Sequence, residues 1–567
     1  MPGLAATLDE APLSRFHARS IVTTGMGLFT DAYDLFIVGT ATTLIAPEWH
    51  LSSTQVGLVN AITLVAAFAG AFVFGRVADR LGRKKLYGLE AALMVGGAVS
   101  SAFAPDLIWL LASRLVLGLG VGGDYPVSAV LMSELSNRHN RGKLVGLVFS
   151  MQALGTVTGY VAGLALLGAG VPGGITWRLL LGLGAVPAAA VIYLRRRMPE
   201  SPRFLAQVQG CGDAAAAAVR KLSGGTLAPV ASRCEGVRMS LWAFLSDRRQ
   251  LMVLAGTAGS WFFFDYAYYG NSVSAPLIVS SVLGGSTAHD LVHVLALQLI
   301  VFTVAAVPGY FLAAFTMDRI GHRRLQLIGF PLMGLAFLLI GVVPGITAMV
   351  GPFLILFGMS YFFAEFGPNT TTFVLAGEVF PTSVRTTGHG ISAGIAKLGA
   401  FIGVFAFPII KADIGVSGAL RLSAVFALAG ALLTLLIPEP ARRSLEDISP
   451  EEVVAGAERI VATVEPGPRD ALPRQLELEP QRAPAEDAAA GSGSGAGGVT
   501  GAGDGGLTGA GAGGVTGAGD GGVTGAGLQG AAGVQGAAGV GSEGGPPELP
   551  EMPDDLSHWA PPVRRSA

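Results

Sequence analysis

The chain has 567 residues, of which 51% are hydrophobic and only 13% are charged. That charged fraction is about half of what an average soluble domain carries, so a soluble globular protein is not expected. The net charge of −2 provides no basic surface for a nucleic acid, and we expect none as a partner.

Twelve stretches are apolar and long enough to cross a lipid bilayer, which takes about 20 residues per helix. They lie near residues 21–46, 54–78, 86–104, 107–134, 144–169, 176–195, 250–283, 289–316, 324–343, 349–376, 388–411 and 418–437. The sequence therefore predicts an all-α membrane protein of twelve transmembrane helices. Its parts are an N-terminal six-helix bundle (18–197), a central cytoplasmic loop (198–248), a C-terminal six-helix bundle (249–438) and a cytoplasmic tail (439–567).

The tail differs from the rest of the chain. Units such as "VTGAGDGG" recur every eight residues from Val499 to Val523, among Gly and Ala. Such a composition cannot build an apolar core, so we expect disorder from about residue 485. At the other end, we expect no cleavable signal, and the first apolar segment would serve as signal and anchor.

Basic residues gather in alternate connecting loops, such as "GRVADRLGRKKLYG" and "SNRHNRGK", while Lys411 is the one exception among the opposite loops. By the positive-inside rule, both termini are predicted to be cytoplasmic. The segments "GRVADRLGRKK" (75–85) and "AFTMDRIGHRR" (314–324) share Asp-Arg-x-Gly and a basic pair. This match indicates an internal repeat, as in many transporters; the simpler interpretation is two ordinary basic turns.

Several charged residues interrupt the apolar segments. A charge at this depth is costly unless it faces water, pairs with a partner or is protonated. Glu90 could simply join the nearby basic loop, and Glu365 could stabilise a kink near Pro368. Functional roles are expected for the three that lie deepest in their segments, which are Asp124, Asp265 and Lys397.

The glycines around Asp124 also spell G-x-G-x-x-G from Gly118 to Gly123, the fingerprint of a dinucleotide site. That motif requires a strand before it and a helix after it, whereas this one continues a long apolar helix. Gly118 and Gly122 instead fit close packing between membrane helices. With no nucleophile–base pair or metal-ligand spacing either, we predict no enzyme and no cofactor or metal.

Trp261, Asp265 and Tyr269 recur every four residues and therefore share one helical face. A carboxylate between two aromatic rings packs poorly, so this face predicts a pocket wall. A monobasic oxyanion such as dihydrogen phosphate would suit it, because a carboxylate accepts from P–OH while Tyr, Trp, Gln and Asn donate. A nearby Lys would supply the opposite charge.

These features resemble the major facilitator superfamily, whose "GxxADRxGRKK" loop and its second copy are present. Within it, "GVGGDYPVSAVLMSELSNRHNRGK" (120–143) and "TDAYDLF" (30–36) resemble the phosphate:proton symporters. The resemblance covers about residues 15–445. By contrast, "PESPRF" (199–204), "PTSVRTTGHG" (381–390) and "PEPARRSLED" (438–447) also resemble elements of sugar and organic-ion carriers.

The resemblance implies proton-coupled import of inorganic phosphate by alternating access across the plasma (cell) membrane, by a multi-pass protein that functions as a monomer. It assigns substrate binding to Tyr125, Gln152, Trp261, Asp265, Tyr269, Asn369 and Lys397. It assigns proton coupling to Asp31 or Asp34, Glu90 and Asp124, and gating to Gly75, Asp79, Arg80, Gly82 and Arg83. The alternatives are a carrier of a sugar, aromatic acid or organic cation, a phosphate-binding nutrient sensor, and sodium in place of protons.

Overall fold

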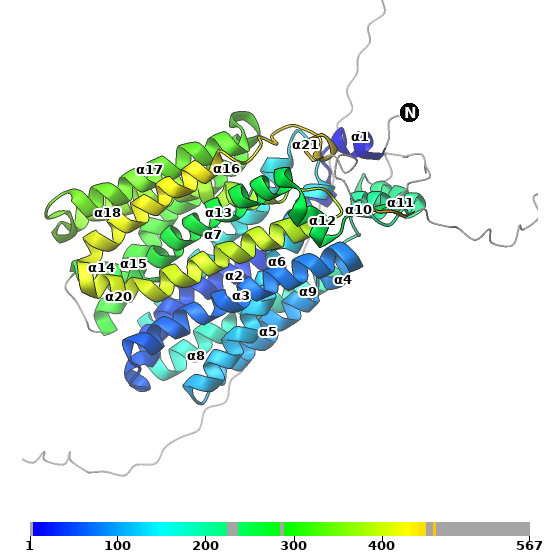
Figure 1. Ribbon diagram of the computed structural model, residues 1–567. Coiled ribbons are helices and arrows are strands. Elements are labelled where there is room, and N and C mark those ends of the chain that lie inside the picture. Colours follow the sequence, from blue (N-terminus) through cyan, green and yellow to red (C-terminus); the bar gives the residue numbers. More distant parts are fainter. Residues whose placement is uncertain (1–3, 224–235, 284–287, 450–457, 461–567) are drawn as a thin grey trace, which may run out of the picture. The chain divides into compact units, whose positions relative to one another are not determined.

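The computed structural model describes residues 4–223, 236–283, 288–449 and 458–460 (Figure 1). These residues are helical apart from loops and a pair of short antiparallel strands, β1 (Gly236–Arg238) and β2 (Glu458–Ile460). In that pair Val237 lies opposite Arg459. The tail predicted to be disordered from about residue 485 lies outside the described residues.

We call the helices up to residue 197 the first half of the molecule. They are α1 (Leu4–Asp9), α2 (Arg15–Glu48), α3 (Ser53–Leu81), α4 (Arg83–Leu86), α5 (Leu89–Ala102), α6 (Leu107–Leu135), α7 (Arg141–Gly168), α8 (Gly173–Leu183) and α9 (Ala185–Arg196). Two short helices follow in the central loop, α10 (Pro202–Gln207) and α11 (Gly212–Leu222).

The helices from residue 248 to residue 434 form the second half, and one short helix lies on either side of them. The helices are α12 (Leu241–Ser246), α13 (Arg248–Val273), α14 (Ala275–Leu283), α15 (Ala288–Val301), α16 (Val307–Ile320), α17 (His322–Val342), α18 (Val350–Ala364), α19 (Thr370–Ala376), α20 (Arg385–Thr434) and α21 (Leu445–Ile448). Two π-helical turns, η1 (Phe302–Ala306) and η3 (Glu365–Asn369), and a 3-10 turn, η2 (Ile346–Ala348), connect some of them.

Each of the twelve predicted segments falls on a helix, but the segments and helices do not correspond one to one. Nine helical segments of the described chain are long and apolar enough to cross a membrane. The helix α5 has only 14 residues, and polar residues lower the hydropathy of α13. The predicted segments 388–411 and 418–437 both lie in α20, where Gly415 leaves helical geometry between them (φ 71°).

The surface of these helices is apolar. Val186, Val304, Ile355 and Leu428 are 65%, 71%, 66% and 58% exposed, respectively. Many charged side chains are buried instead, which is the reverse of a soluble protein. Lipid can cover such a surface while the helices satisfy their own backbone groups. The chain is therefore a multi-pass membrane protein.

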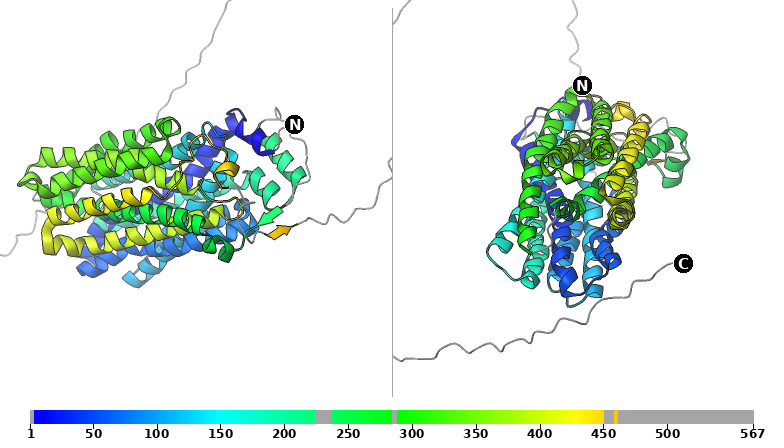
Figure 2. Two further views of the ribbon diagram at one scale, coloured as in Figure 1. Left: turned by 45° about the horizontal axis from the view of Figure 1, so that its top comes forward. Right: turned by 90° about the vertical axis from the view of Figure 1, so that its left-hand side faces the viewer.

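The helices that matter for the site pack along one another in a regular pattern. In the first half α3 and α5 lie against α6, and α2 lies against α7; in the second half α13 and α17 lie against α20. Two long contacts join the halves, α3 with α20 and α7 with α16, and the first pair runs side by side in Figures 1 and 2. Side chains of α2, α6 and α7 can therefore meet those of α13 and α20.

Glycines allow α3 and α6 to approach closely, as predicted for Gly118 and Gly122. A Cβ atom at Gly118 would lie 2.3 Å from the carbonyl oxygen of Thr63, and one at Gly122 would lie 2.0 Å from that of Ala67. Both distances are far shorter than any real contact, so no larger side chain fits without moving a backbone. This close approach places Asp124, two residues after Gly122, in the interior.

We predict that Gly122→Ala destabilises the protein by about 1–3 kcal/mol, the usual effect of forcing extra atoms into a packed core. The matched control is Gly96→Ala in α5, because a Cβ atom there meets nothing within 4 Å. Thermal unfolding of the purified protein in detergent checks both changes. An unfolding temperature that falls equally in the two variants would contradict this account of the α3–α6 contact.

Candidate functional site

A buried ion pair joins α13 to α20. Lys397 donates to Asp265 Oδ2 at 3.1 Å and to the hydroxyl of Tyr269 at 3.3 Å. Its ammonium group also lies 4.5 and 4.4 Å from the ring centres of Tyr125 and Tyr269, which adds cation–π attraction. All four side chains are at most 2% exposed. Asp265 and Lys397 both lie where α13 and α20 pack along each other, so the contact between these helices sets the position of the pair.

The first half brings a second polar group against this pair. Tyr125 donates to Asp31 Oδ2 at 2.6 Å, and the amide of Gln152 donates to Tyr125 at 2.8 Å and to Asp31 at 3.3 Å. From the second half, Tyr310 donates to Gln152 Oε1 at 3.4 Å. Asn369 in turn donates to the hydroxyl of Tyr310 at 3.1 Å. Hydrogen bonds thus run from α2 to η3 across both halves.

Trp261 joins the group by packing its ring against Tyr125, with ring centres 6.2 Å apart. Two acceptors in the group, the Oδ1 atoms of Asp31 and Asp265, have no hydrogen-bond partner among the described residues. The structure thus brings all the predicted substrate-binding residues together. We call this group the central cluster; it comprises Asp31, Tyr125, Gln152, Trp261, Asp265, Tyr269, Tyr310, Asn369 and Lys397.

The two aspartates of α2 have different partners. Asp34 accepts from both terminal nitrogens of Arg114 at 2.6 Å, in a buried bidentate pair that ties α2 to α6. Asp31 instead bonds Tyr125 in the central cluster. The geometry therefore separates two residues that the sequence alone could not distinguish, and it places Asp31 in the cluster.

Asp124 and Glu90 share one buried arginine. Arg195 of α9 lies 2.5 Å from Asp124 Oδ1 and 3.7 Å from Glu90 Oε1. Ser128 also donates to Asp124 Oδ1, at 2.9 Å, and the guanidinium group stacks 4.1 Å from the ring centre of Tyr87. Glu90 therefore faces the interior together with Asp124. From the sequence alone, the simpler interpretation was that Glu90 joins the nearby basic loop.

A set of polar contacts closes the molecule where α3 ends and α20 begins; we call this the closed end. Asp79 accepts from the backbone N–H groups of Thr386 and Thr387 at 3.2 and 2.6 Å. A carboxylate at the start of a helix satisfies free N–H groups and complements the helix dipole. Asp79 of the first half therefore fastens the first turn of a second-half helix.

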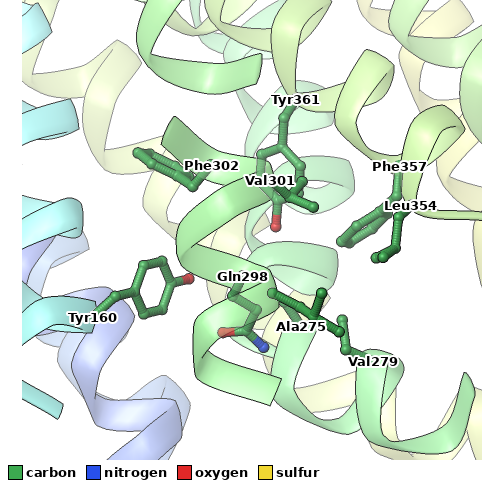
Figure 3. A pocket seen from close by; sticks show the side chains of 10 residues that line it. Tyr160, Ala275, Val279, Gln298, Val301, Phe302, Leu354, Phe357 and Tyr361 are labelled. Carbon is green, nitrogen blue, oxygen red and sulfur yellow. The ribbon is translucent and has the colours of Figure 1, made fainter. Parts of the chain in front are cut away.

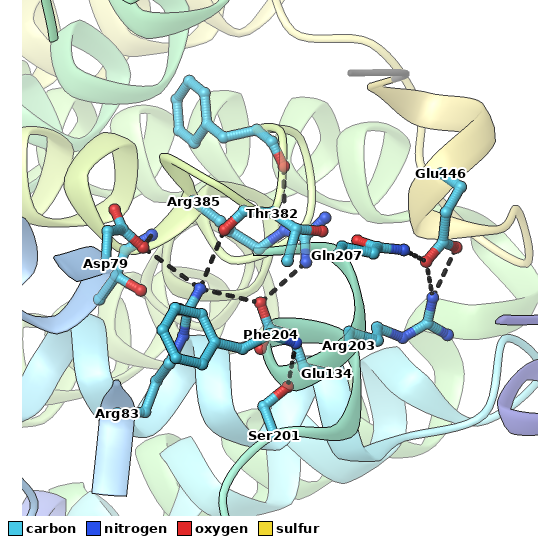
Figure 4. Close-up of polar contacts among 12 residues, drawn as sticks. Asp79, Arg83, Glu134, Ser201, Arg203, Phe204, Gln207, Thr382, Arg385 and Glu446 are labelled. Atoms are coloured by element: carbon cyan, nitrogen blue, oxygen red, sulfur yellow. Dashed lines mark hydrogen bonds and ion pairs between the residues drawn. The ribbon is translucent and has the colours of Figure 1, made fainter. Parts of the chain in front are cut away.

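Arg83 extends these contacts (Figure 4). It bonds Glu134 at 3.2 Å and donates to the carbonyl oxygen of Thr382 at 3.0 Å. Arg385 approaches the same carboxylate, at 3.0 Å. The Arg83 guanidinium also lies 4.3 Å from the ring centre of Phe204, a residue of the "PESPRF" segment. One buried glutamate thus holds an arginine from each half.

The remaining residues of the predicted gating loop have distinct positions. Gly82 has φ 98°, a conformation that favours glycine. Glu200 accepts from the backbone N–H groups of Arg83 and Lys84, the two residues after Gly82, at 3.2 and 3.1 Å. A Cβ atom at Gly75 would lie 2.7 Å from the carbonyl oxygen of Thr386. Arg80, by contrast, is exposed and stands outside these contacts.

The second half repeats this arrangement. Asp318 of α16 accepts from the N–H groups of Gly142 and Lys143 at the start of α7, at 3.0 and 2.7 Å. Glu378 lies 3.3 Å from both Arg141 and His322. The repeated sequence motif thus marks a repeated set of contacts, in which Asp318, His322, Glu378 and Arg141 take the places of Asp79, Arg83, Glu134 and Arg385.

At the other end of the helices, the open end, a cavity of about 460 Å³ lies between the two halves. Thr42, Asn60 and Lys411 are among the residues that line it, and Thr42 donates to Asn60 at 2.6 Å. Phe36, one turn before the lining residue Gly39, has its ring centre 6.4 Å from that of Tyr269. The cavity therefore approaches the central cluster from the open end.

Sequence reasoning missed several partners in these contacts. Arg114 stands inside an apolar segment, the same signal that identified Asp124, and was therefore identifiable. Arg195 begins the run "RRRMPESPRF", and Glu134 lies at the end of its segment. Tyr310 carries no sequence signal that separates it from a packing residue. Among the described residues, no group of three His, Cys, Asp or Glu side chains could hold a metal ion.

Glu378 gives a test of the closed end. Burial alone would raise the pKa of this carboxyl group, but Arg141 and His322 hold it below its ordinary value. Because the pKa is lower in the folded than in the unfolded protein, the ionised group stabilises the fold above about pH 4.3, the unfolded value. That stabilisation is lost as the pH falls through the lowered pKa.

We predict that Glu378→Gln lowers stability at pH 7 by about 3–5 kcal/mol, since it leaves Arg141 buried without its partner. The difference from wild type should shrink as the sample is acidified. The exposed Glu10, which pairs with Arg138 on the surface, gives the matched control Glu10→Gln, with an expected change below about 1 kcal/mol. Thermal unfolding across the acid range checks this, and a pH-independent difference for Glu378→Gln would contradict it.

Comparison with known proteins adds to these observations. The family model for sugar (and other) transporters matches residues 20–451. The chain is 34% identical over 493 residues to the probable inorganic phosphate transporter 1-6 of Arabidopsis thaliana, covering 78% of this chain and 95% of that one. It is 32% identical over 516 residues to the repressible high-affinity phosphate permease of Neurospora crassa, covering 80% and 90%.

Among solved structures, the proton:xylose symporter XylE of the major facilitator superfamily, bound to 6-bromo-6-deoxy-D-glucose, has a similar fold. The TM-score is 0.66 with 21% sequence identity, over 76% of this chain and 98% of that one. This likeness concerns the fold, while the family follows from the sequence matches. The chain therefore belongs to the sugar (and other) transporter family of the major facilitator superfamily, together with the inorganic phosphate transporters.

Proposed function

We propose that this protein imports inorganic phosphate together with protons. The observation that carries the proposal is the central cluster, where carboxylate and tyrosine groups contact the buried Lys397 and two amides belong to the same cluster. Monobasic phosphate has both P–O acceptors and P–OH donors. Lys397 and the amides can donate to it, while the Oδ1 atoms of Asp31 and Asp265 can accept from it. The names of the curated relatives point to the same substrate.

An oxyanion suits this cluster better than a sugar does. Removing Lys397 and Asp265 from water costs desolvation free energy, and the attraction between the two charges offsets that cost only in part. A charged ligand forms shorter and stronger hydrogen bonds with an ammonium group than a neutral hydroxyl does. Neutral sugar hydroxyls would need amides more than an ion pair, so we favour phosphate over the sugar alternative.

The proton-handling groups in this proposal are Asp31, Asp124 and Glu90. Asp31 belongs to the central cluster, and Asp124 and Glu90 share Arg195, with no other ion pair to either carboxylate among the described residues. Asp34 has a bidentate arginine of its own, which fits a structural role. Bringing one negative charge inward against 100 mV takes about 2.3 kcal/mol. One proton would cancel that charge, and a second would let the voltage drive uptake.

Alternating access follows from the two ends. The closed end carries the basic loops, so the positive-inside rule assigns it to the cytoplasm, with both termini and the tail. The open-end cavity would then face outward. We infer twelve spans, with α20 supplying two, in a monomer of the plasma (cell) membrane. The two halves would rock about the central cluster and exchange which end is closed.

We predict that Asp265→Asn lowers phosphate uptake by about 100-fold or more, because the change removes both an acceptor for P–OH and the partner of Lys397. The measurement is uptake of labelled phosphate into proteoliposomes, with and without an inward proton gradient. Asp213→Asn, at an exposed position of α11, is the matched control and should transport like wild type.

The same assay separates the alternatives. Competition by sugars, aromatic acids or organic cations would favour those substrates. Uptake driven by a sodium gradient would show that sodium, and not the proton, is the coupling ion. A folded protein that binds phosphate but moves none would favour a nutrient sensor. Uptake that follows the proton gradient and resists these competitors is the result we expect.

We also predict that Asp124→Asn abolishes stimulation of uptake by an inward proton gradient. The neutral side chain cannot take up a proton, and it leaves Arg195 with Glu90 alone. Exchange of internal for external phosphate should continue, since the central cluster is unchanged. Exchange and gradient-driven uptake are measured in the same proteoliposomes. Normal acid-stimulated uptake by this variant would contradict a proton role for Asp124.

A further inference from the structure

A buried carboxyl group in the second half has no part in the function proposed above. Glu365 is fully buried and begins the π-helical turn η3, in which Gly367 leaves helical geometry (φ −117°, ψ −107°) just before Pro368. Single π-helical turns within helices occur frequently at functional sites. This turn brings the side chain of Glu365 against that of Asn369, a member of the central cluster.

Glu365 has one strong hydrogen-bond donor. Asn369 Nδ2 donates to Glu365 Oε2 at 2.6 Å and to the hydroxyl of Tyr310 at 3.1 Å. Glu365 Oε1 has no partner among the described residues, nor has the buried hydroxyl of Tyr268 beside it. An amide nitrogen has two hydrogens, so Asn369 has no N–H free for a substrate while it holds Glu365.

No cation neutralises this carboxyl group within the described part of the chain. The ionisable groups that face it are phenols, from Tyr268 on α13, Tyr310 on α16 and Tyr361 on α18. The other helices packed against η3 are α17, whose ionisable residues are confined to its first turn, and α19, which has none. Asp34, Asp124 and Asp265, by contrast, each pair with a cation.

Hydrogen bonds connect Glu365 to the central cluster. They pass from Asn369 to Tyr310 and from Tyr310 to Gln152, which bonds Asp31. A change in the charge of Glu365 is therefore felt first by Asn369, which we assigned to substrate binding. The carboxyl group is positioned to respond to what the cluster binds.

Toward the open end lies a small pocket that is lined mostly by apolar side chains but also by three polar ones. Tyr361, one turn before Glu365, points its hydroxyl toward Gln298, and so does Tyr160 from α7 (Figure 3). Gln298 is 5% exposed, and both polar atoms of its amide lack a partner among the described residues. The pocket leaves about 10 Å³ for the centre of a water molecule, which is room for about one water.

We propose that Glu365 is a further proton-binding site of this carrier, coupled to substrate binding through Asn369; this rests on the function proposed above. When Asn369 turns its N–H groups to phosphate, the Glu365 carboxylate loses its donor and gains an anion as a neighbour. The Glu365 carboxylate then takes a proton from water in the Gln298 pocket and becomes a neutral acid. Protons from the surrounding solution restore this water. By reciprocity, the proton on Glu365 strengthens phosphate binding.

Calorimetric titration of the full-length protein with inorganic phosphate tests this proposal. Titrations in two buffers with different heats of ionisation count the protons taken up per phosphate bound. Glu365→Gln keeps an oxygen that accepts from Asn369 but cannot take a proton, so we expect about one proton fewer than in wild type, with Kd within about tenfold. Glu365→Asp keeps a carboxyl group and should keep the wild-type count.

Equal proton counts in wild type and Glu365→Gln would overturn the proposal. A purely structural role of Glu365 would lower the unfolding temperature or the affinity without changing the count. Should Glu365→Gln fail to fold, a proton count in Glu365→Asp that falls below wild type by about one, at unchanged Kd, would likewise overturn it.

Infrared titration without phosphate separates this proposal from the proposed function. A protonated buried carboxyl group has its own C=O stretching band. As the pH falls, the band of Glu365 should appear in wild type and in the exposed control Glu10→Gln but not in Glu365→Gln. A protein that shows this band yet binds no phosphate would contradict the proposed substrate and leave the proton site intact. A spectrum unchanged by Glu365→Gln would overturn the proton site.

Discussion

The cost of burying a charge is the constraint on which the rest of this structure depends. Helices covered by apolar side chains enclose an interior in which an unpaired charge is unfavourable. Asp34 and Arg114 tie α2 to α6, and Asp265 and Lys397 tie α13 to α20. Each pair joins helices far apart in the chain and fixes which of their faces are in contact. The buried charges therefore hold the helices in place.

The same constraint explains what the sequence can predict. A charge inside an apolar stretch is conspicuous, so Asp265 and Lys397 were identifiable. Trp261 and Tyr269 each lie four residues from Asp265, which placed all three on one helical face. Partners were harder to predict, because they depend on how helices rotate against one another. Arg195 is indistinguishable in sequence from the two arginines after it, yet it alone of the three is buried. Helix ends were also hard to predict. Two separate segments were expected where the structure has the single helix α20, interrupted only at Gly415.

The repeated motif gives both halves the same kind of contact at the closed end. Each half supplies an aspartate, Asp79 or Asp318, to the first turn of a helix in the other half. Both bonds cross the boundary between the halves at the same end of the molecule. A rigid rotation that separated the halves there would break both sets together, so intermediate arrangements would retain neither. Two packed arrangements with little between them are what an alternating carrier needs.

The free energy needed to open the closed end can be small. If Glu134 and Glu378 stayed buried after losing their arginines, each loss would cost about 3–5 kcal/mol. Separation lets water reach the same groups, however, and an exposed pair is worth about 0–1 kcal/mol. The central ion pair differs, because Asp265 and Lys397 both belong to the second half and would move as one unit. The bond between Tyr310 and Gln152 that crosses the boundary there is long, at 3.4 Å. An anion that bridged this boundary would therefore couple the halves more strongly than the empty cluster does, so that under the proposed function phosphate binding and opening of the closed end would be linked.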